Sequence, residues 1–171
     1  MLQNFKKLLS NKNNTNDYFE HRILNTDIYK ESKEGEDSII FGCGCFWGAE
    51  KCFWKLPGVV TTSVGYAGGN KNNPTYYEVC TGLTGHAEVV RVIWNINEID
   101  ISDLLKMFWE CHNPTQKDRQ GNDIGSQYRS AIFYKNDKNK EIIFSSKKEF
   151  QKELSKCNMG LIQTEINNIE S

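Results

Sequence analysis

The chain has 171 residues, a quarter of them charged, and a formal net charge of −1 at pH 7. This length predicts a single domain with a sizeable core, and the balanced charge argues against broad electrostatic binding to nucleic acid or to an anionic membrane surface. The sequence has no apolar run near the roughly 18–20 residues that cross a bilayer, and its polar start lacks the apolar core of a secretory signal, so we expect a cytoplasmic protein.

The first half of the chain begins with a polar segment, so we expect an N-terminal extension over residues 1–36 and one domain over 37–171. "DSIIFGC" (37–43) predicts a short buried strand that enters a Gly-Cys-Gly turn. A helix is expected over 47–56, ended by a Pro-Gly pair, and the β-branched "VVTTSV" (59–64) predicts the second strand.

A long glycine-rich loop is expected over 65–85, and a loop of that length inside a compact domain is usually functional. Residues 86–95 alternate in polarity and predict a strand. Residues 102–112 predict a helix, with Ser102 as its N-cap.

The last part of the chain holds a second polar loop, a strand over 128–134, an amphipathic helix over 138–156 and an edge strand over 160–166. The element order is therefore β-α-β-β-α-β-α-β. This order predicts an α+β domain that has a mixed sheet, a split βαβ (ferredoxin-like) core and helices mainly on one face.

Six cysteines are spread along the chain, at positions 43, 45, 52, 80, 111 and 157. A cytosolic domain of this size does not need a disulfide framework. The sequence has no C-x-x-C pair and only three histidines, so a zinc site built from Cys43, Cys45, Cys52 and a distant histidine fits poorly. We expect reduced thiols and no metal or cofactor.

Cys45 is the candidate nucleophile, in the stretch "FGCGCFWGAE" (41–50). It falls where the first strand ends and a helix begins, and the backbone N–H groups at a helix start favour a thiolate. Gly44 and Gly48 leave space around the sulfur, and Phe46 and Trp47 supply an apolar wall. The alternative is a small buried cysteine in a tight turn.

Several ordered blocks of the sequence resemble the A-type peptide-methionine sulfoxide reductase family, which reduces the S epimer of methionine sulfoxide. These blocks are "GCFWG", "PGV", "GYAGG", "NPTYYEVCTG", "GHAE" and "RQGNDIGSQYRSAI", and the resemblance runs from about residue 35 to about 166. It implies an oxidoreductase that repairs oxidised proteins and also reduces free methionine sulfoxide, with thioredoxin or another dithiol as the reductant.

The reduction of a sulfoxide needs a thiolate, an apolar cradle for the methyl group and a proton donor for the oxygen. The family pattern assigns the donors to Glu88, Tyr76 and Tyr128. Glu88 shares its predicted strand face with apolar residues, so burial should raise the pKa of its carboxyl and keep it protonated. Asp123 falls on a further family position, where we expect it to hold the loop or the tyrosines by hydrogen bonds. Taken singly, these residues also fit an exposed glutamate and surface tyrosines.

The sequence does not identify the resolving thiol, the second thiol that the reaction requires. Reduction leaves a sulfenic acid on Cys45, which a second thiol must convert to a disulfide. Many family members carry resolving cysteines in a glycine-rich tail after the last strand, and we expect this domain to end early relative to them. Cys80, on the glycine-rich loop, and Cys157, after the last helix, are the candidates inside the chain, beside direct reduction by an external thiol.

Other functions fit the same residue types. Six thiols and the C-x-C pair fit a general thiol peroxidase or disulfide oxidoreductase, and a short C-terminus fits a non-catalytic binding module. A Cys45–His86 hydrolase dyad is a further possibility on residue types alone. For the favoured reading we expect a monomer with no nucleic-acid or membrane partner.

Overall fold

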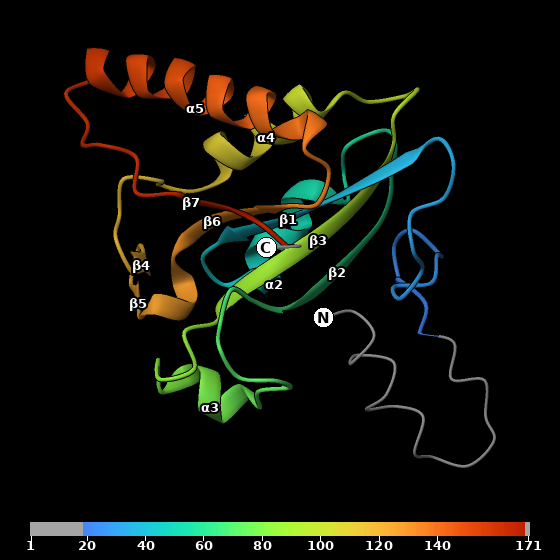
Figure 1. The fold of residues 1–171 in the computed structure, drawn as a ribbon, viewed down its shortest axis with the longest axis horizontal. Coiled ribbons are helices and arrows are strands. Elements are labelled where there is room, and N and C mark those ends of the chain that lie inside the picture. The colour runs from blue at the N-terminus through green and yellow to red at the C-terminus, as the bar shows by residue number, and fades with distance from the viewer. Residues whose placement is uncertain (1–18, 170–171) are drawn as a thin grey trace.

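The computed structural model describes residues 19–169, and the first half of the expected N-terminal extension lies outside them. Its main feature is a five-stranded sheet in the order β2-β3-β1-β6-β7 (Figure 1). The strands are β1 (Glu36–Cys43), β2 (Val59–Ala67), β3 (Ala87–Asn95), β6 (Ser130–Tyr134) and β7 (Glu165–Asn168). Among the strand pairs of this sheet in residues 19–169, only β6–β7 is parallel, so the predicted α+β class with a mixed sheet is confirmed.

The helices α2 (Phe46–Phe53), α4 (Ile101–Cys111) and α5 (Lys138–Lys156) share one hydrophobic core with the sheet. Phe41 of β1 is at its centre, with its ring stacked on Phe53 at 4.9 Å and on Phe108 at 5.0 Å between centroids. Because one β1 side chain touches both α2 and α4, these helices cover the same face. A smaller apolar cluster around Val89 and Phe133 lies on the opposite face.

The order of the large elements matches the predicted one, but several boundaries differ: α2 ends at Phe53 rather than at residue 56, and β2 continues to Ala67 rather than ending at residue 64. Ser102 is not the N-cap of α4: that position is Asp100, whose Oδ1 accepts from the Ser102 N–H at 2.8 Å. The edge strand begins at Glu165 rather than at residue 160, and β6 begins at Ser130, after a short 3-10 turn over Ser126–Tyr128.

Two further differences concern the predicted loops. A short helix, α3 (Tyr76–Cys80), interrupts the glycine-rich loop. Thr75 and Glu78 form a capping box at its start, in which each side chain accepts from the other residue's backbone N–H. The second loop contains a small hairpin of β4 (Arg119–Gln120) and β5 (Asp123–Ile124).

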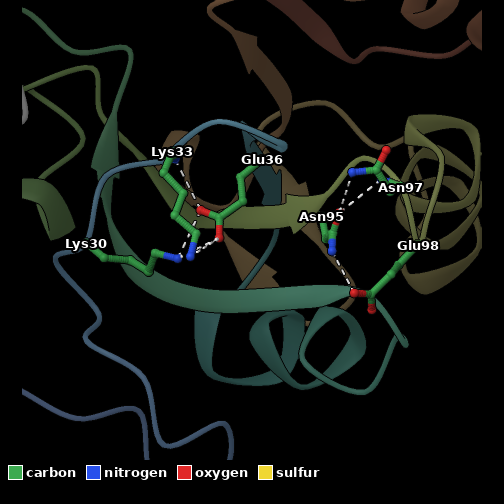
Figure 2. Close-up of polar contacts among 6 residues, drawn as sticks. All are labelled: Lys30, Lys33, Glu36, Asn95, Asn97 and Glu98. Carbon is green, nitrogen blue, oxygen red and sulfur yellow. Dashed lines mark hydrogen bonds and ion pairs between the residues drawn. The ribbon is translucent and has the colours of Figure 1, made fainter.

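The described part of the N-terminal extension packs along the sheet. Arg91 of β3 donates through Nη2 to the backbone oxygens of Ile28 and Lys30, at 2.8 and 3.0 Å. Figure 2 shows the edge where β1 begins and β3 ends: Lys30 donates to the Glu36 carboxylate at 2.9 Å, while Asn95 holds the turn that follows β3. These contacts fix residues 28–36 against the domain.

Within residues 19–169, no helix is long and apolar enough to cross a membrane.

Candidate active site

The site forms at one end of the sheet, where the strand order brings together the ends of β1 and β2 and the starts of β3 and β6. Antiparallel pairing sets Tyr66 of β2 opposite Glu88 of β3, and Cys43 of β1 opposite Ser130 of β6. The helix α3 and the β4–β5 hairpin lie at the same end, at the lower left of Figure 1. Segments far apart in sequence therefore meet around the end of β1.

Cys45 lies at the strand-to-helix turn, as predicted, as the exposed N-cap of α2. Its carbonyl accepts from the Gly48 and Ala49 N–H groups at 3.2 Å each, which starts the helix. Gly44, before it, has φ +89°, and a Cβ there would stand 2.7 Å from the Gln120 side chain. This turn therefore requires a glycine, both for its backbone conformation and for the close approach of β4.

Gln120 is itself held in place by Asn113. Its Oε1 accepts from the Asn113 N–H at 3.1 Å, and its Nε2 donates to the Asn113 carbonyl at 3.2 Å. The segment between α4 and β6 thus braces the turn that presents Cys45.

Glu88 is the buried acid of the site, with 3% of its surface exposed. Its Oε2 accepts from the backbone N–H of Phe46 at 3.1 Å, next to Cys45 in sequence. Burial raises the pKa of the Glu88 carboxyl, the charge of Asp123 adds to that rise, and the Phe46 N–H opposes it. The net direction is upward, as the sequence predicted, so Glu88 holds a proton, and can donate it, to a higher pH than a free glutamate does.

Three tyrosines lie close enough to Glu88 for its charge to raise their pKa values: Tyr66 of β2, Tyr76 at the start of α3 and Tyr128 in the 3-10 turn. Tyr66 was not predicted from the sequence. Burial and the Glu88 charge raise the pKa of Tyr66 to about 12. Burial, followed by Glu88, also raises the pKa of Tyr128. Phenols with raised pKa values stay protonated at neutral pH and can donate hydrogen bonds.

The segment that carries Tyr128 is fixed by Arg129. Its Nη1 donates to the Ser126 carbonyl at 2.9 Å, its Nη2 to the Gly85 carbonyl at 3.0 Å and its Nε to the Glu165 carboxylate at 2.9 Å. Arg129 thereby joins the 3-10 turn to β7 and to the loop before β3.

The two aromatic residues after Cys45 differ in burial. The half-buried Phe46 ring packs on Tyr66, with 5.8 Å between ring centroids. Trp47 is 78% exposed, so its indole is free to contact an incoming group. The turn therefore presents one anchored ring and one accessible ring beside the thiol.

Asp123 and His86 differ in burial. Asp123 is exposed in β5, and it acts on Glu88 and Tyr128 through its charge; its hydrogen-bonding role stays a prediction. His86 is buried, because its ring fills the space beside Gly69, where a Cβ would be 2.1 Å from Nδ1. Burial, together with the nearby Arg129 charge, lowers the pKa of the His86 ring.

Cys80 is the second thiol at this end of the molecule. It is the exposed last residue of α3, and a hydrogen bond between its thiol and the phenol of Tyr76 raises the pKa of that tyrosine. Its sulfur also acts electrostatically on Tyr66 and Tyr128. Cys157 is exposed as well, but it lies at the end of α5.

Comparison with known proteins gives one consistent result. Residues 37–171 match the family model described as "Peptide methionine sulfoxide reductase". The "Peptide methionine sulfoxide reductase MsrA" of Vibrio vulnificus (strain CMCP6) is 51% identical over 146 residues, which cover 85% of this chain and 70% of that protein. The chain spans 63–70% of the length of the first curated relatives that it matches.

Solved structures agree with the sequence comparison. Methionine sulfoxide reductase A of Corynebacterium diphtheriae superposes with a TM-score of 0.78 at 42% identity, over 88% of this chain and 71% of that one. Mxr1 from Saccharomyces cerevisiae, solved in complex with Trx2, superposes with a TM-score of 0.57 at 25% identity, over 79% of this chain and 77% of that one.

Proposed function

The chain belongs to the peptide methionine sulfoxide reductase family, and from this premise we propose that it reduces methionine S-sulfoxide, free and in proteins, to methionine. The observation that carries the proposal is the hydrogen bond from the Phe46 N–H to Glu88 Oε2 at 3.1 Å. This bond ties the turn that presents the thiol to a buried acid on another strand. A sulfoxide needs both a thiolate and a proton donor, and this bond supports a site in which Cys45 and Glu88 act together.

In the proposed reaction the Cys45 thiolate attacks the sulfoxide sulfur while Glu88 gives its proton to the oxygen. Tyr76 and Tyr128 donate hydrogen bonds to the same oxygen, and Tyr66, opposite Glu88, is placed to assist them. The hydroxyl then passes from the substrate sulfur to the Cys45 sulfur: a new S–O bond forms on Cys45 as the substrate S–O bond and the transient S–S bond break, methionine leaves, and Cys45 carries a sulfenic acid. The sulfoxide sulfur is reduced by two electrons, and Cys45 is oxidised by two.

The substrate methyl group is expected to rest on the rings of Phe46 and Trp47. Phe46 is anchored against Tyr66, while the 78% exposed indole of Trp47 can close over an apolar group. Burial of a methyl group against such rings contributes about 0.8 kcal/mol. This contact would favour a methyl sulfoxide over a small polar oxidant such as peroxide.

The catalytic cycle requires a second thiol. That thiol condenses with the Cys45 sulfenic acid, releasing water and leaving a disulfide, which an external dithiol then reduces. We assign the external role to thioredoxin or a similar dithiol protein, and the structure of yeast Mxr1 with Trx2 supports that choice. Within the chain, Cys80 is favoured over Cys157 because it lies among the tyrosines of the site.

For the fold, we infer that the four strands β2-β3-β1-β6 form a ferredoxin-like split βαβ core. Their order and their wholly antiparallel pairing support this, with β7 added as a parallel edge strand.

The test is the turnover of N-acetylmethionine S-sulfoxide with dithiothreitol, comparing the unaltered chain with Cys45→Ser. We expect methionine formation by the unaltered chain and by Cys157→Ser, and none by Cys45→Ser. Equal activity of the Cys45→Ser variant, or no activity of a folded unaltered chain, would overturn the proposal.

A further inference from the structure

A second group of thiols lies behind the turn that carries Cys45, and the proposed reaction does not use it. The ligand atoms of Cys43, Cys111 and His112 all lie within 4.8 Å of one another. Cys43 is the last residue of β1, Cys111 the last residue of α4, and His112 the residue that caps α4. The fold therefore brings together possible metal ligands from the ends of β1 and α4, which lie far apart in the sequence and form no recognisable metal-binding motif there.

Cys52 adds a third sulfur to this group. It is half-buried on α2, where its thiol donates to the Gly48 carbonyl at 3.8 Å, and it acts electrostatically on Cys111 and on Cys43 from outside the mutually close group. The four residues thus offer three sulfurs and one imidazole around Cys111. This is the ligand composition of a Cys₃His site.

The separations are close to those that a tetrahedral metal requires. With Zn–S bonds of about 2.3 Å, two sulfurs on one zinc ion are about 3.8 Å apart, and a sulfur and an imidazole nitrogen about 3.6 Å. The Cys111 Sγ and the His112 Nδ1 are 4.0 Å apart. The other two pairs among the three lie within 4.8 Å, so side-chain rotations are enough to bring the three ligand atoms to the metal-bound distances.

A histidine that binds a metal through one ring nitrogen usually makes a hydrogen bond through the other, and His112 has such a partner. Its Nε2 lies 2.7 Å from Ser130 Oγ, which in turn lies 2.8 Å from Thr164 Oγ1. With the proton on Nε2, this chain of hydroxyls holds the ring and leaves Nδ1 to face Cys111. Without metal, Nδ1 donates its proton to the Phe108 carbonyl at 2.7 Å, so metal binding requires both the loss of that proton and a turn of the ring away from the carbonyl.

We propose that Cys43, Cys52, Cys111 and His112 bind one thiophilic divalent ion of the Zn²⁺ class. Three sulfurs and an imidazole exclude hard cations such as Mg²⁺ and Ca²⁺, which prefer oxygen. Four protein ligands fill a tetrahedral shell, so the ion has a structural role: it joins the end of β1, α2 and the end of α4 beneath the Cys45 turn. Cys45 itself is exposed and is not one of the ligands.

The test is a titration of the fully reduced full chain with Co²⁺, followed by its displacement with Zn²⁺. The Cys45→Ser variant serves as the parent, because it removes the exposed nucleophile and keeps metal binding independent of sulfoxide reduction. We expect one equivalent of Co²⁺ to give the thiolate charge-transfer band and the visible bands of a tetrahedral site. X-ray absorption of the zinc form should give three sulfur neighbours and one nitrogen neighbour.

Variants in the same parent locate the site. Ser130→Ala removes a hydrogen-bond partner of His112 and should weaken Zn²⁺ binding by about 10–100-fold. Cys111→Ser and the half-exposed Cys52→Ser each remove a ligand and should weaken Zn²⁺ binding by more than that. Cys80→Ser and Cys157→Ser are the matched controls and should bind as the parent does. Absence of a tetrahedral cobalt spectrum in the reduced parent, or a spectrum unchanged in a folded Cys111→Ser variant, would overturn the assignment.

Discussion

The backbone N–H of Phe46 donates to Oε2 of Glu88 at 3.1 Å, across 42 residues of sequence. Through this bond the first turn of α2, which begins at the nucleophile, sets the position of the acid on β3. The bond acts to stabilise the carboxylate, but burial acts more strongly in the other direction, so the pKa of Glu88 is raised. The fold therefore sets both the position of the acid and the upward direction of its pKa shift.

The Glu88→Gln substitution separates these two properties. The amide oxygen can still accept from Phe46, while the transferable proton is lost. We expect the fold to be retained and kcat/KM for N-acetylmethionine S-sulfoxide to fall by about 10²–10⁴-fold, the usual contribution of a positioned acid. The surface substitution Glu98→Gln should leave the rate unchanged, and a Glu88→Gln rate near that of the parent would remove Glu88 from the mechanism.

The raised pKa of Glu88 also makes a prediction about stability. Above its ordinary value of 4.5, the unfolded chain releases the Glu88 proton while the folded chain still holds it. The folded state then binds more protons, so the free energy of unfolding decreases as pH rises from about 4.5 through the raised pKa, and below 4.5 the contribution is fully present. Urea unfolding of the parent and of Glu88→Gln, from about pH 4 to pH 8, should show the difference between them shrinking or changing sign in that direction. Parallel curves for the two proteins would contradict the shift.

The sequence predicted the order of the large elements because each carries a long and clear pattern. The helix over 138–156 has the observed bounds, and the alternating strand differs by one residue at its start. The short elements escaped prediction: α3 has five residues and each strand of the small hairpin has two. The capping box of Thr75 and Glu78, readable as T-x-x-E, was the available signal for α3.

The residues of the candidate site were likewise predictable only where a local sequence motif marks them. Cys45, Glu88 and Tyr128 stand in recognisable motifs, so the sequence could nominate them. Tyr66 reaches the site only through the register of β2 on β3, which sets it opposite Glu88. Cys111 likewise reaches Cys43 only through the packing of α4 on the sheet. Pairing register and helix packing are long-range properties that a local pattern does not contain.

Trp47 provides a test of substrate choice. Its side chain is 78% exposed, so Trp47→Ala should change the free energy of unfolding by no more than about 0.5 kcal/mol. Loss of the apolar contact with the methyl group, worth at most about 0.8 kcal/mol, should lower kcat/KM for the sulfoxide up to about fourfold. Leu161→Ala, which removes another exposed apolar side chain, is the matched control. A general thiol peroxidase would not depend on Trp47, so an unchanged sulfoxide rate would favour that reading.

Cys80 can be tested as the resolving thiol by mass spectrometry after one equivalent of sulfoxide without reductant. We expect a Cys45–Cys80 disulfide, because Cys80 lies beside Tyr76 in the site. Cys80→Ser should still form one methionine per chain, but its thioredoxin-dependent turnover should slow, while Cys157→Ser behaves as the parent. A Cys45–Cys157 disulfide, or a sulfenic acid that persists in the parent, would show that Cys80 does not resolve the intermediate.

Two glycines on either side of Cys45 give a matched pair for testing the turn. Gly44 has φ +89°, and a Cβ there would meet the Gln120 side chain at 2.7 Å, whereas a Cβ at Gly48 would have no atom within 4 Å. Gly44→Ala should therefore lower the free energy of unfolding by about 1–3 kcal/mol, and Gly48→Ala, inside α2, should raise it by about 0.5–1 kcal/mol. A shift of the turn by about 1 Å would misplace the thiol relative to Glu88, so kcat/KM of Gly44→Ala should fall about 10²-fold even where the protein is folded. Urea unfolding and steady-state kinetics on both variants check this, and an active, stable Gly44→Ala protein would show that the turn tolerates another geometry.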